Sequence, residues 1–277
     1  MMPAGRPVGS FTARFRTLAW TKAVKQFEIQ DGHVVVGSDM HYWPDKPRTT
    51  AHAAMVRLCL AMQPNLIIAN GDVLDFPKIG RHPSIGWEAR PEVADEIEIG
   101  KERLGEIAAA APGARRIWNA GNHDLRFEST IANRAPELAG VQGVHLHDHF
   151  PAWEPAWMVE INEAVMVKHR WKGGVHAAHN NTVQSGRSIV TGHLHSAQVT
   201  CFTDYNGTRY GVDTGTLAVP FDEAFIDYTE ANPVNWRSAV TVLTFYNGRL
   251  LLPEQLHVFD EAQRLTMFRG QVVQEDE

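Results

Sequence analysis

The chain has 277 residues, of which 44% are hydrophobic and 21% are charged; this is ordinary globular usage and excludes the fibrous and disordered classes. Lys and Arg number 26 against 32 Asp and Glu, and the net charge of −6 argues against a protein that coats nucleic acid or an anionic membrane. The length suits one large α/β domain.

The two cysteines and the apolar runs indicate in which cellular compartment the protein is expected. Cys59 and Cys201 form no CxxC pair and no disulfide framework, as is usual for proteins of a reducing compartment. We find no apolar run long enough for a signal-peptide core or for a membrane helix. We therefore expect a cytoplasmic protein that has no membrane partner.

The first half of the chain alternates predicted strands and helices. Val34 to Val36 is a continuous apolar run, typical of a strand that is buried on both faces. Such alternation favours a parallel sheet with crossover helices. The predicted elements are strands over 27–30 and 33–37 about a turn at 31–32, a helix over 49–63, a strand over 66–69, a helix over 92–111 and a strand over 117–120.

The second half contains pairs of short strands instead. Each pair is separated by a turn dipeptide, which is Asn-Gly at 206–207 and at 247–248, the strongest short-range signal for a hairpin. We therefore expect a second, antiparallel or mixed sheet. Residues 1–26 are weakly patterned and are expected to be an N-terminal extension, with 27–277 forming a single domain that includes the C-terminal hairpins. The predicted strand pairs are 159–161 with 164–168, 199–205 with 208–212, and 239–246 with 249–252.

Polar clusters follow the predicted strands of the parallel half. Ligands of open α/β sheets bind at the carboxyl ends of the strands, so these clusters are expected to meet at one edge. Oxygen and imidazole donors without thiolate suit manganese, iron or zinc. Seven such donors suffice for two metal ions, which together can activate water and hold both oxygens of an in-line phosphoryl displacement. The clusters are Asp39 with His41, Asp72 with Asp75, Asn122 with His123 and Asp124, then His169, then His193 with His195.

In this order, the five clusters resemble the signature of the calcineurin-like metallophosphoesterase superfamily: D-x-H, G-D-x-x-D, G-N-H-(D/E), a lone H and G-H-x-H. The resemblance covers residues 39–195. It implies an α/β fold, a four-layer α/β/β/α sandwich of two mixed sheets with a dinuclear metal site at the strand ends. Phe76 and Asp124 depart from the protein-phosphatase pattern, and His123 departs from the arginine of the lipid A diphosphatases. The resemblance is therefore to the small bacterial and phage phosphoesterases.

The resemblance implies a role for each residue. His123 would assist the leaving group and Asp75 would orient His123, while the role of Asp124 stays open. Two divalent metal ions are implied, and we expect manganese, with iron, zinc, nickel or magnesium as alternatives. His176 and His179 are rivals of His169 as a ligand. The implied metal ligands are Asp39, His41 and His195 for one ion, Asn122, His169 and His193 for the other, and Asp72 as the bridge between them.

The implied activity is that of a metal-dependent phosphoric ester hydrolase. It would cleave a phosphate ester, preferably a phosphodiester, by in-line attack of a metal-bridging hydroxide while His123 assists the leaving group. One alternative is an SbcD-like DNA or RNA nuclease, and another is a binding protein that keeps a vestigial site. Whether the substrate is a small molecule or a nucleic acid, and the oligomeric state, are left open by the sequence.

Three further features have two interpretations each. Arg170 and Lys172 directly follow His169 and are candidates for substrate phosphate contacts, or they are solvated surface. The tryptophans at 153, 157 and 171 are candidates for stacking on a nucleobase, or they pack in the core or in an interface. The alternating histidines at 145, 147 and 149 form a third metal site or an exposed strand or loop near the mouth of the site.

Overall fold

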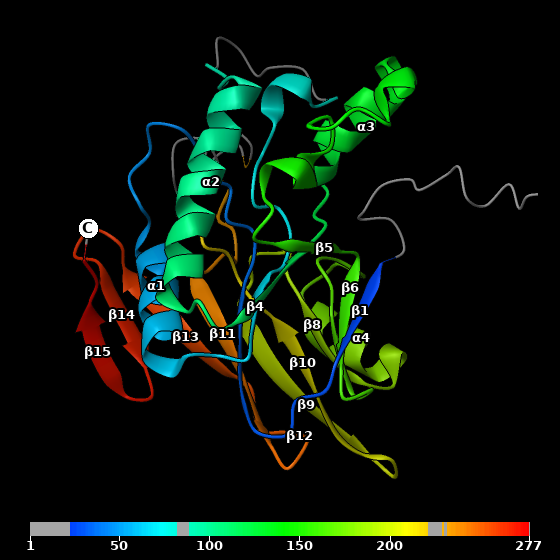
Figure 1. Cartoon of the computed structure of the whole chain (residues 1–277). Coiled ribbons are helices and arrows are strands. Elements are labelled where there is room, and N and C mark those ends of the chain that lie inside the picture. Colours follow the sequence, from blue (N-terminus) through cyan, green and yellow to red (C-terminus); the bar gives the residue numbers. More distant parts are fainter. Residues whose placement is uncertain (1–22, 82–88, 221–228, 230–231, 277) are drawn as a thin grey trace, which may run out of the picture.

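The computed structural model describes residues 23–81, 89–220, 229 and 232–276. These residues form a mixed α/β fold that contains two mixed β-sheets, as expected from the sequence (Figure 1). None of the helices in the described part combines the length and the apolar composition that crossing a membrane requires. The single-domain organisation and the cytoplasmic location stay predictions.

The larger sheet has nine strands and contains the parallel strands expected from the first half of the chain. Its parallel part is β2 (Gly32–Gly37), β3 (Leu66–Ala69), β4 (Arg115–Asn119) and β5 (Glu154–Ala156). Its antiparallel part continues from β2 through β11 (Ala239–Tyr246), β13 (Glu254–Asp260), β14 (Leu265–Phe268) and β15 (Gln271–Gln274), and β12 (Arg249–Leu250) pairs with β11.

The smaller sheet has six strands and is built from the middle of the chain and from one N-terminal strand. It contains both parallel pairs, such as β7 with β8, and antiparallel pairs, such as β6 with β7. The strand order is β1 (Val24–Phe27), β6 (Met158–Ile161), β7 (Val165–Val167), β8 (Ser188–Thr191), β10 (Gly207–Asp213) and β9 (Gln198–Asp204).

Alternate residues of the buried strands serve two apolar cores, because successive side chains of a strand point to opposite faces. Val34 and Val36 pack with Val159 of the smaller sheet, so the two sheets face each other across one core. Val35 packs with Leu104 in the other core, which covers the outer face of the larger sheet. The helices are α1 (Thr50–Met62), α2 (Val93–Ala110), α3 (Asp124–Arg134) and α4 (Ala177–Ser185), with short 3-10 turns at Pro77–Ile79, Pro136–Leu138 and Leu146–His149.

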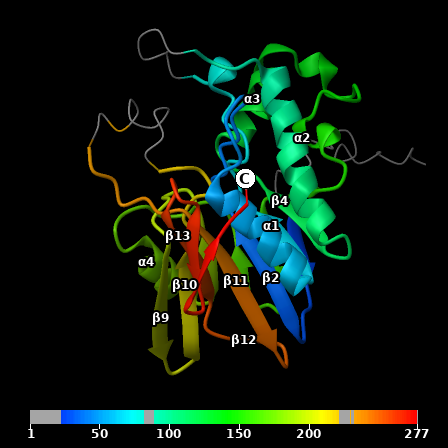
Figure 2. The ribbon, with the colours of Figure 1, turned by 90° about the vertical axis from the view of Figure 1, so that its left-hand side faces the viewer.

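The helices lie on both sides of the paired sheets. α1 packs against α2 and against β2, β11, β13 and β14 of the larger sheet, whereas α4 packs against β8, β9 and β10 of the smaller one. Figure 2 shows α1 and α2 beside β2, with α4 behind β9 and β10.

Several sequence expectations differ from the structure. The strands about residues 31–32 form no hairpin, because β1 pairs with β6 in one sheet and β2 pairs with β3 and β11 in the other. β1 begins at Val24, so the expected boundary after residue 26 falls inside a strand. The hairpin at 247–248 forms but joins the larger sheet rather than the second one, and β13 to β15 extend it further. Both cysteines are free, as expected.

Candidate metal centre

The polar clusters come together at one edge, because neighbouring parallel strands end side by side. Asp39, Asp72 and Asn122 follow β2, β3 and β4 of the larger sheet, while His169 and His193 follow β7 and β8 of the smaller sheet. The loops are joined directly: the main-chain N–H groups of Met40 and His41 both donate to the carbonyl of Asp72, at 2.8 and 3.1 Å. The site is therefore built between the two sheets.

The first group of converging donors is Asp39, His41 and His195. Asp39 Oδ1 lies 3.1 Å from Nε2 of His195 and 4.0 Å from Nε2 of His41, and the two imidazole nitrogens are 3.4 Å apart. All three residues are buried. His41 points its Nε2 inward because its Nδ1 donates to Asp75 Oδ1 at 2.9 Å.

The second group is Asp72, His169 and His193. Nε2 of His169 lies 3.1 Å from Asp72 Oδ2 and 3.2 Å from the amide oxygen of Asn122. The Nδ1 of His169 donates to the carbonyl of Asn70 at 2.8 Å, which fixes the tautomer and leaves Nε2 available as a ligand atom. The structure thus places Asn122 and His169 with the residues that the sequence assigned to the same ion.

His123 and Asp75 form a third group with His41. Nδ1 of His123 lies 2.5 Å from Asp75 Oδ1, and its Nε2 lies 3.8 Å from Asp72 Oδ2. Asp75 therefore contacts two imidazoles, His123 as expected and His41 in addition. These three residues could also hold a cation between them.

The backbone at this edge is held in an unfavourable conformation. Five of the predicted ligands have positive φ values and none of them is glycine, although such residues rarely adopt the left-handed region. Each such residue costs on the order of 1 kcal/mol, and conformations of this kind cluster at functional sites. The residues and angles are Asp39 at 52°, His41 at 45°, Asp72 at 51°, His193 at 73° and His195 at 57°.

Two glycines allow the loops to approach. A Cβ on Gly71 would lie 2.5 Å from the His169 ring, and a Cβ on Gly121 would lie 2.0 Å from the main-chain nitrogen of Asp72. Gly71 also has a φ of 86°. Any side chain at either position would push the loops after β3 and β4 apart.

Two buried carboxylates outside the predicted set hold the loop after β3. Asp124 accepts hydrogen bonds from the main-chain N–H groups of Asp72, Val73 and Leu74, at 2.9 to 3.2 Å. Glu96 of α2 accepts from the N–H groups of Asp75 and Phe76, at 3.2 and 2.7 Å. The structure therefore gives Asp124 the positioning role that the sequence left open. Glu96 was missed, and its signal was a carboxylate on the inward stripe of an otherwise apolar helix face.

The electrostatics of the site favour bound positive charge. Burial opposes a charge on His41, but the carboxylates of Asp75, Asp72 and Asp39 outweigh it and raise the pKa of His41 to about 9. At His169 the carboxylates of Asp72 and Asp39 likewise outweigh the effect of burial and raise the pKa of His169 to about 10. The pKa of Asp72 is lowered, because His169, His123 and His41 together outweigh its burial.

These residues fit divalent metal ions. The Nε2 atoms of His41 and His195 face each other at 3.4 Å beside the Asp39 carboxylate, an arrangement that can share a proton or hold a metal ion. Asp72 belongs to the second group, and its charge also helps to raise the pKa of His41 in the first. Carboxylate, amide and imidazole donors without thiolate suit hard or borderline metals, and nothing in the donor set selects one of them.

The remaining predicted residues lie farther out. Arg170 and Lys172 are exposed on the loop after His169, and their contact with substrate stays a prediction. Trp153 is buried in the core, whereas Trp157 and Trp171 are about 40% exposed. The segment containing His147 and His149 is a 3-10 turn rather than a strand, so the alternating histidines do not share a strand face.

Arg126, on the first turn of α3, is a site residue that was not predicted as one. Its Nη1 donates to the carbonyl of Asp75 at 2.6 Å, and its Nη2 lies 3.3 Å from His123 Nε2. A guanidinium therefore stands beside the imidazole expected to serve the leaving group. The sequence offered Arg126 only as one of several arginines that could form a basic groove toward the metals.

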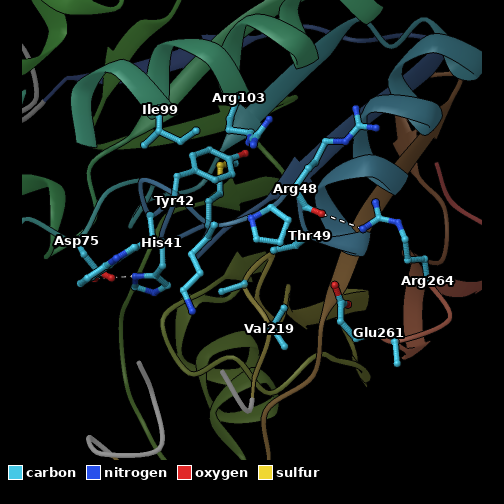
Figure 3. A pocket seen from close by; sticks show the side chains of 16 residues that line it. His41, Tyr42, Arg48, Thr49, Asp75, Ile99, Arg103, Val219, Glu261 and Arg264 are labelled. Atoms are coloured by element: carbon cyan, nitrogen blue, oxygen red, sulfur yellow. Dashed lines mark hydrogen bonds and ion pairs between the residues drawn. The ribbon is translucent and has the colours of Figure 1, made fainter. Parts of the chain in front are cut away.

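A cavity of about 480 Å³ adjoins the centre (Figure 3). His41 and Asp75 line it, and its other walls come from the segment Met40 to Thr49, from α2 and from the turn between β13 and β14. Ligand sites for small organic molecules commonly have this size.

The comparisons with known proteins give no family. No protein-family model matches the sequence, and no curated protein matches it. Among solved structures, the chain is similar to Vps29 from Chaetomium thermophilum, with a TM-score of 0.44 and 9% identity over 87% of this chain and 95% of that one. It is also similar to a serine/threonine phosphatase from Saccharomyces cerevisiae that resembles human phosphatase PP5, with a TM-score of 0.39 and 11% identity over 86% of this chain and 84% of that one. Similarities at these values add no argument about function.

Proposed function

We propose that the protein is a dinuclear metal-dependent phosphoesterase, with a phosphodiester as the preferred substrate. The observation that carries the proposal is the convergence of buried carboxylate and imidazole donors from five chain segments, with His123 beside them. A four-layer α/β/β/α arrangement belongs to the same proposal. It is supported by the separate cores between the sheets and under α1 and α2, and by α4 on the smaller sheet.

Asp39, His41 and His195 would hold one ion and Asn122, His169 and His193 the other, with Asp72 shared. When bound, two divalent ions activate water for attack on phosphorus and offset the negative charge of the phosphoryl oxygens. The hydrogen bonds at Nδ1 orient the rings of His41 and His169 so that Nε2 faces the centre. Manganese is the metal we expect first.

His123 would supply the proton for the leaving oxygen. Asp75 holds the ring at Nδ1, so that Nε2 is the atom that faces the substrate side, near Asp72. Arg126 places a guanidinium 3.3 Å from this nitrogen of His123. Both groups act where negative charge accumulates as the ester bond breaks.

The test is hydrolysis of bis(p-nitrophenyl) phosphate by the protein loaded with Mn²⁺. We expect turnover that a chelator abolishes and that added metal restores, with about two metal ions per chain by elemental analysis. A labelled oligonucleotide assayed in parallel tests the nuclease alternative. Bound metal without turnover of any mono- or diester would refute the proposal in favour of a binding protein.

A further inference from the structure

The cavity beside the metal centre has two different ends. His41 and Asp75 form one end, so a molecule inside it touches residues of the candidate centre. Arg48, Glu261 and Arg264 form the other end, and Figure 3 shows the two groups on opposite sides of the pocket. A ligand that fills the cavity must therefore extend well beyond the group that reacts.

Cationic side chains predominate in the lining. Arg48 and Arg103 each pair with Glu106 of α2, at 3.2 and 2.7 Å, so their charges are partly compensated. Glu261 is engaged by α1, because its Oε1 accepts from the main-chain N–H of Thr50 at 2.9 Å. The charged residues of the lining are Lys46, Arg48, Arg103 and Arg264 against Asp75 and Glu261.

Arg264 is the cation best suited to bind an anion. Its Nε and Nη1 donate to the main-chain carbonyls of Glu275 and Arg48, at 3.2 and 2.9 Å, and its Nη2 donates to the carbonyl of Asp276. A guanidinium has five N–H donors, so two remain after these three bonds. Within the described part of the chain, no carboxylate forms an ion pair with Arg264. Its orientation is thus fixed while its charge is not neutralised.

The wall between the two ends is apolar and rigid. Tyr42 and Ile99 line it, and Figure 3 shows both above His41, with Tyr42 on the side toward Arg48. The Tyr42 hydroxyl lies 2.7 Å from Nδ1 of His52, whose Nε2 lies 3.0 Å from Glu106. Burial raises the pKa of Tyr42, so its hydroxyl stays protonated and donates a hydrogen bond to Nδ1 of His52. The ring is therefore held in place and offers a surface for an organic group.

We infer that this cavity binds the organic part of the substrate and that Arg264 binds a second phosphate group on it. The substrate class is then a small organic phosphodiester with a further phosphate, about the size of a nucleotide. The inference rests on the proposed function for the reacting end only. A volume of about 480 Å³ is typical of a small-molecule site.

The kinetic test compares two p-nitrophenyl esters of thymidine 5′-phosphate, one of which also carries a 3′-phosphate. We expect wild-type protein to prefer the bisphosphate in kcat/KM, and Arg264→Gln to reduce that preference about tenfold or more, as loss of a charged hydrogen bond does. Arg264→Lys should keep most of it. Arg269→Gln is the matched control, since Arg269 pairs with Glu254 outside the cavity. Equal effects of Arg264→Gln on both esters would overturn the inference.

A binding measurement separates this inference from the proposed function. Calorimetry with thymidine 3′,5′-bisphosphate and thymidine 5′-monophosphate requires no turnover. If the metal-loaded protein hydrolyses neither ester but binds the bisphosphate more tightly, and Arg264→Gln removes that difference, the cavity assignment stands and the phosphoesterase proposal falls. Equal affinity of wild-type protein for the two nucleotides overturns the cavity assignment, whatever the activity.

Discussion

Two groups of histidines in this chain have very different surroundings. The histidines at 41, 169, 193 and 195 come from loops of both sheets and meet the buried carboxylates of Asp39 and Asp72. Those at 145, 147 and 149 lie within one short turn and bind local partners. His145 contacts Glu128 and the carbonyl of Ala139, and His149 contacts the carbonyl of Gly143.

The candidate metal centre is therefore distinguished by convergence of donors from distant segments rather than by histidine density. In the short turn, His145 and His149 each contact nearby groups, and Asp148 accepts from the main-chain N–H groups of Gly143 and His145. At the strand ends, the donors are brought together from segments far apart in the chain, at the cost of strained backbone. A variant in the candidate metal centre can therefore be compared with a matched variant in the short turn.

The largest effect is expected for Asp72→Asn. Loss of the shared carboxylate should lower metal affinity by about 100-fold or more and abolish activity, since even residues that only support a ligand are worth 10- to 100-fold. Asp148→Asn, in the other group, is the matched control and should change neither. Metal content after gel filtration and kcat/KM measure the two outcomes. Equal metal content in the two variants would contradict the assignment.

The next largest effect is expected for His123→Asn. The variant should keep its metal but lose about 10²- to 10⁴-fold in kcat, the usual contribution of a general acid. Because a leaving group of low pKa needs little protonation, the loss should be smaller for p-nitrophenyl esters than for alkyl esters. His147→Asn is the control. Loss of metal together with activity would mean that His123 is a ligand instead.

A smaller effect is expected from pH. Raised pKa values at His41 and His169 stabilise the metal-free protein below about pH 6.5, and this contribution is lost as pH rises through about 9 to 10. Metal binding must displace these protons, so metal affinity should rise with pH over the same window. Calorimetry in two buffers of different ionisation enthalpy should show proton release near pH 7.5. An affinity that does not change between pH 6.5 and 8.5 would contradict this.

The smallest effect is expected at Glu96. Burial raises the pKa of Glu96 to about 8, so glutamine, which keeps an acceptor oxygen without the charge, should leave stability and activity nearly unchanged. Glu96→Ala removes the acceptor for two main-chain N–H groups and should cost about 2 kcal/mol in unfolding free energy. Urea unfolding measures both variants. If alanine were as stable as glutamine, Glu96 would not hold the Asp75 loop.

The local part of the fold could be predicted from the sequence. α1 was expected over 49–63 and spans Thr50–Met62, because its apolar spacing and the proline at 64 are local signals. The partners of β1 and β11 could not be predicted, because pairing depends on packing between distant segments. The dipeptide at 31–32 favours a hairpin locally, yet the burial of Val34 and Val36 against the other sheet determines where β2 lies.

The candidate ligands could be predicted because each directly follows an apolar strand. The residues that support them could not. Glu96 and Arg126 act from helices, and their roles follow from how α2 and α3 lie on the loop after β3. Arg264 reaches the cavity from the turn after β13, a segment in which no element was expected.

The place of β11 has a consequence for synthesis of the protein. β11 is an interior strand of the larger sheet, where Thr241 pairs with Val36 and Val240 pairs with Leu256. β11 therefore leaves the ribosome long after β2, the strand whose end supplies Asp39 and His41. Until it emerges, β2 has an open edge, and contacts between such distant segments form slowly. A nascent chain of this protein would need protection from aggregation until translation has passed β11.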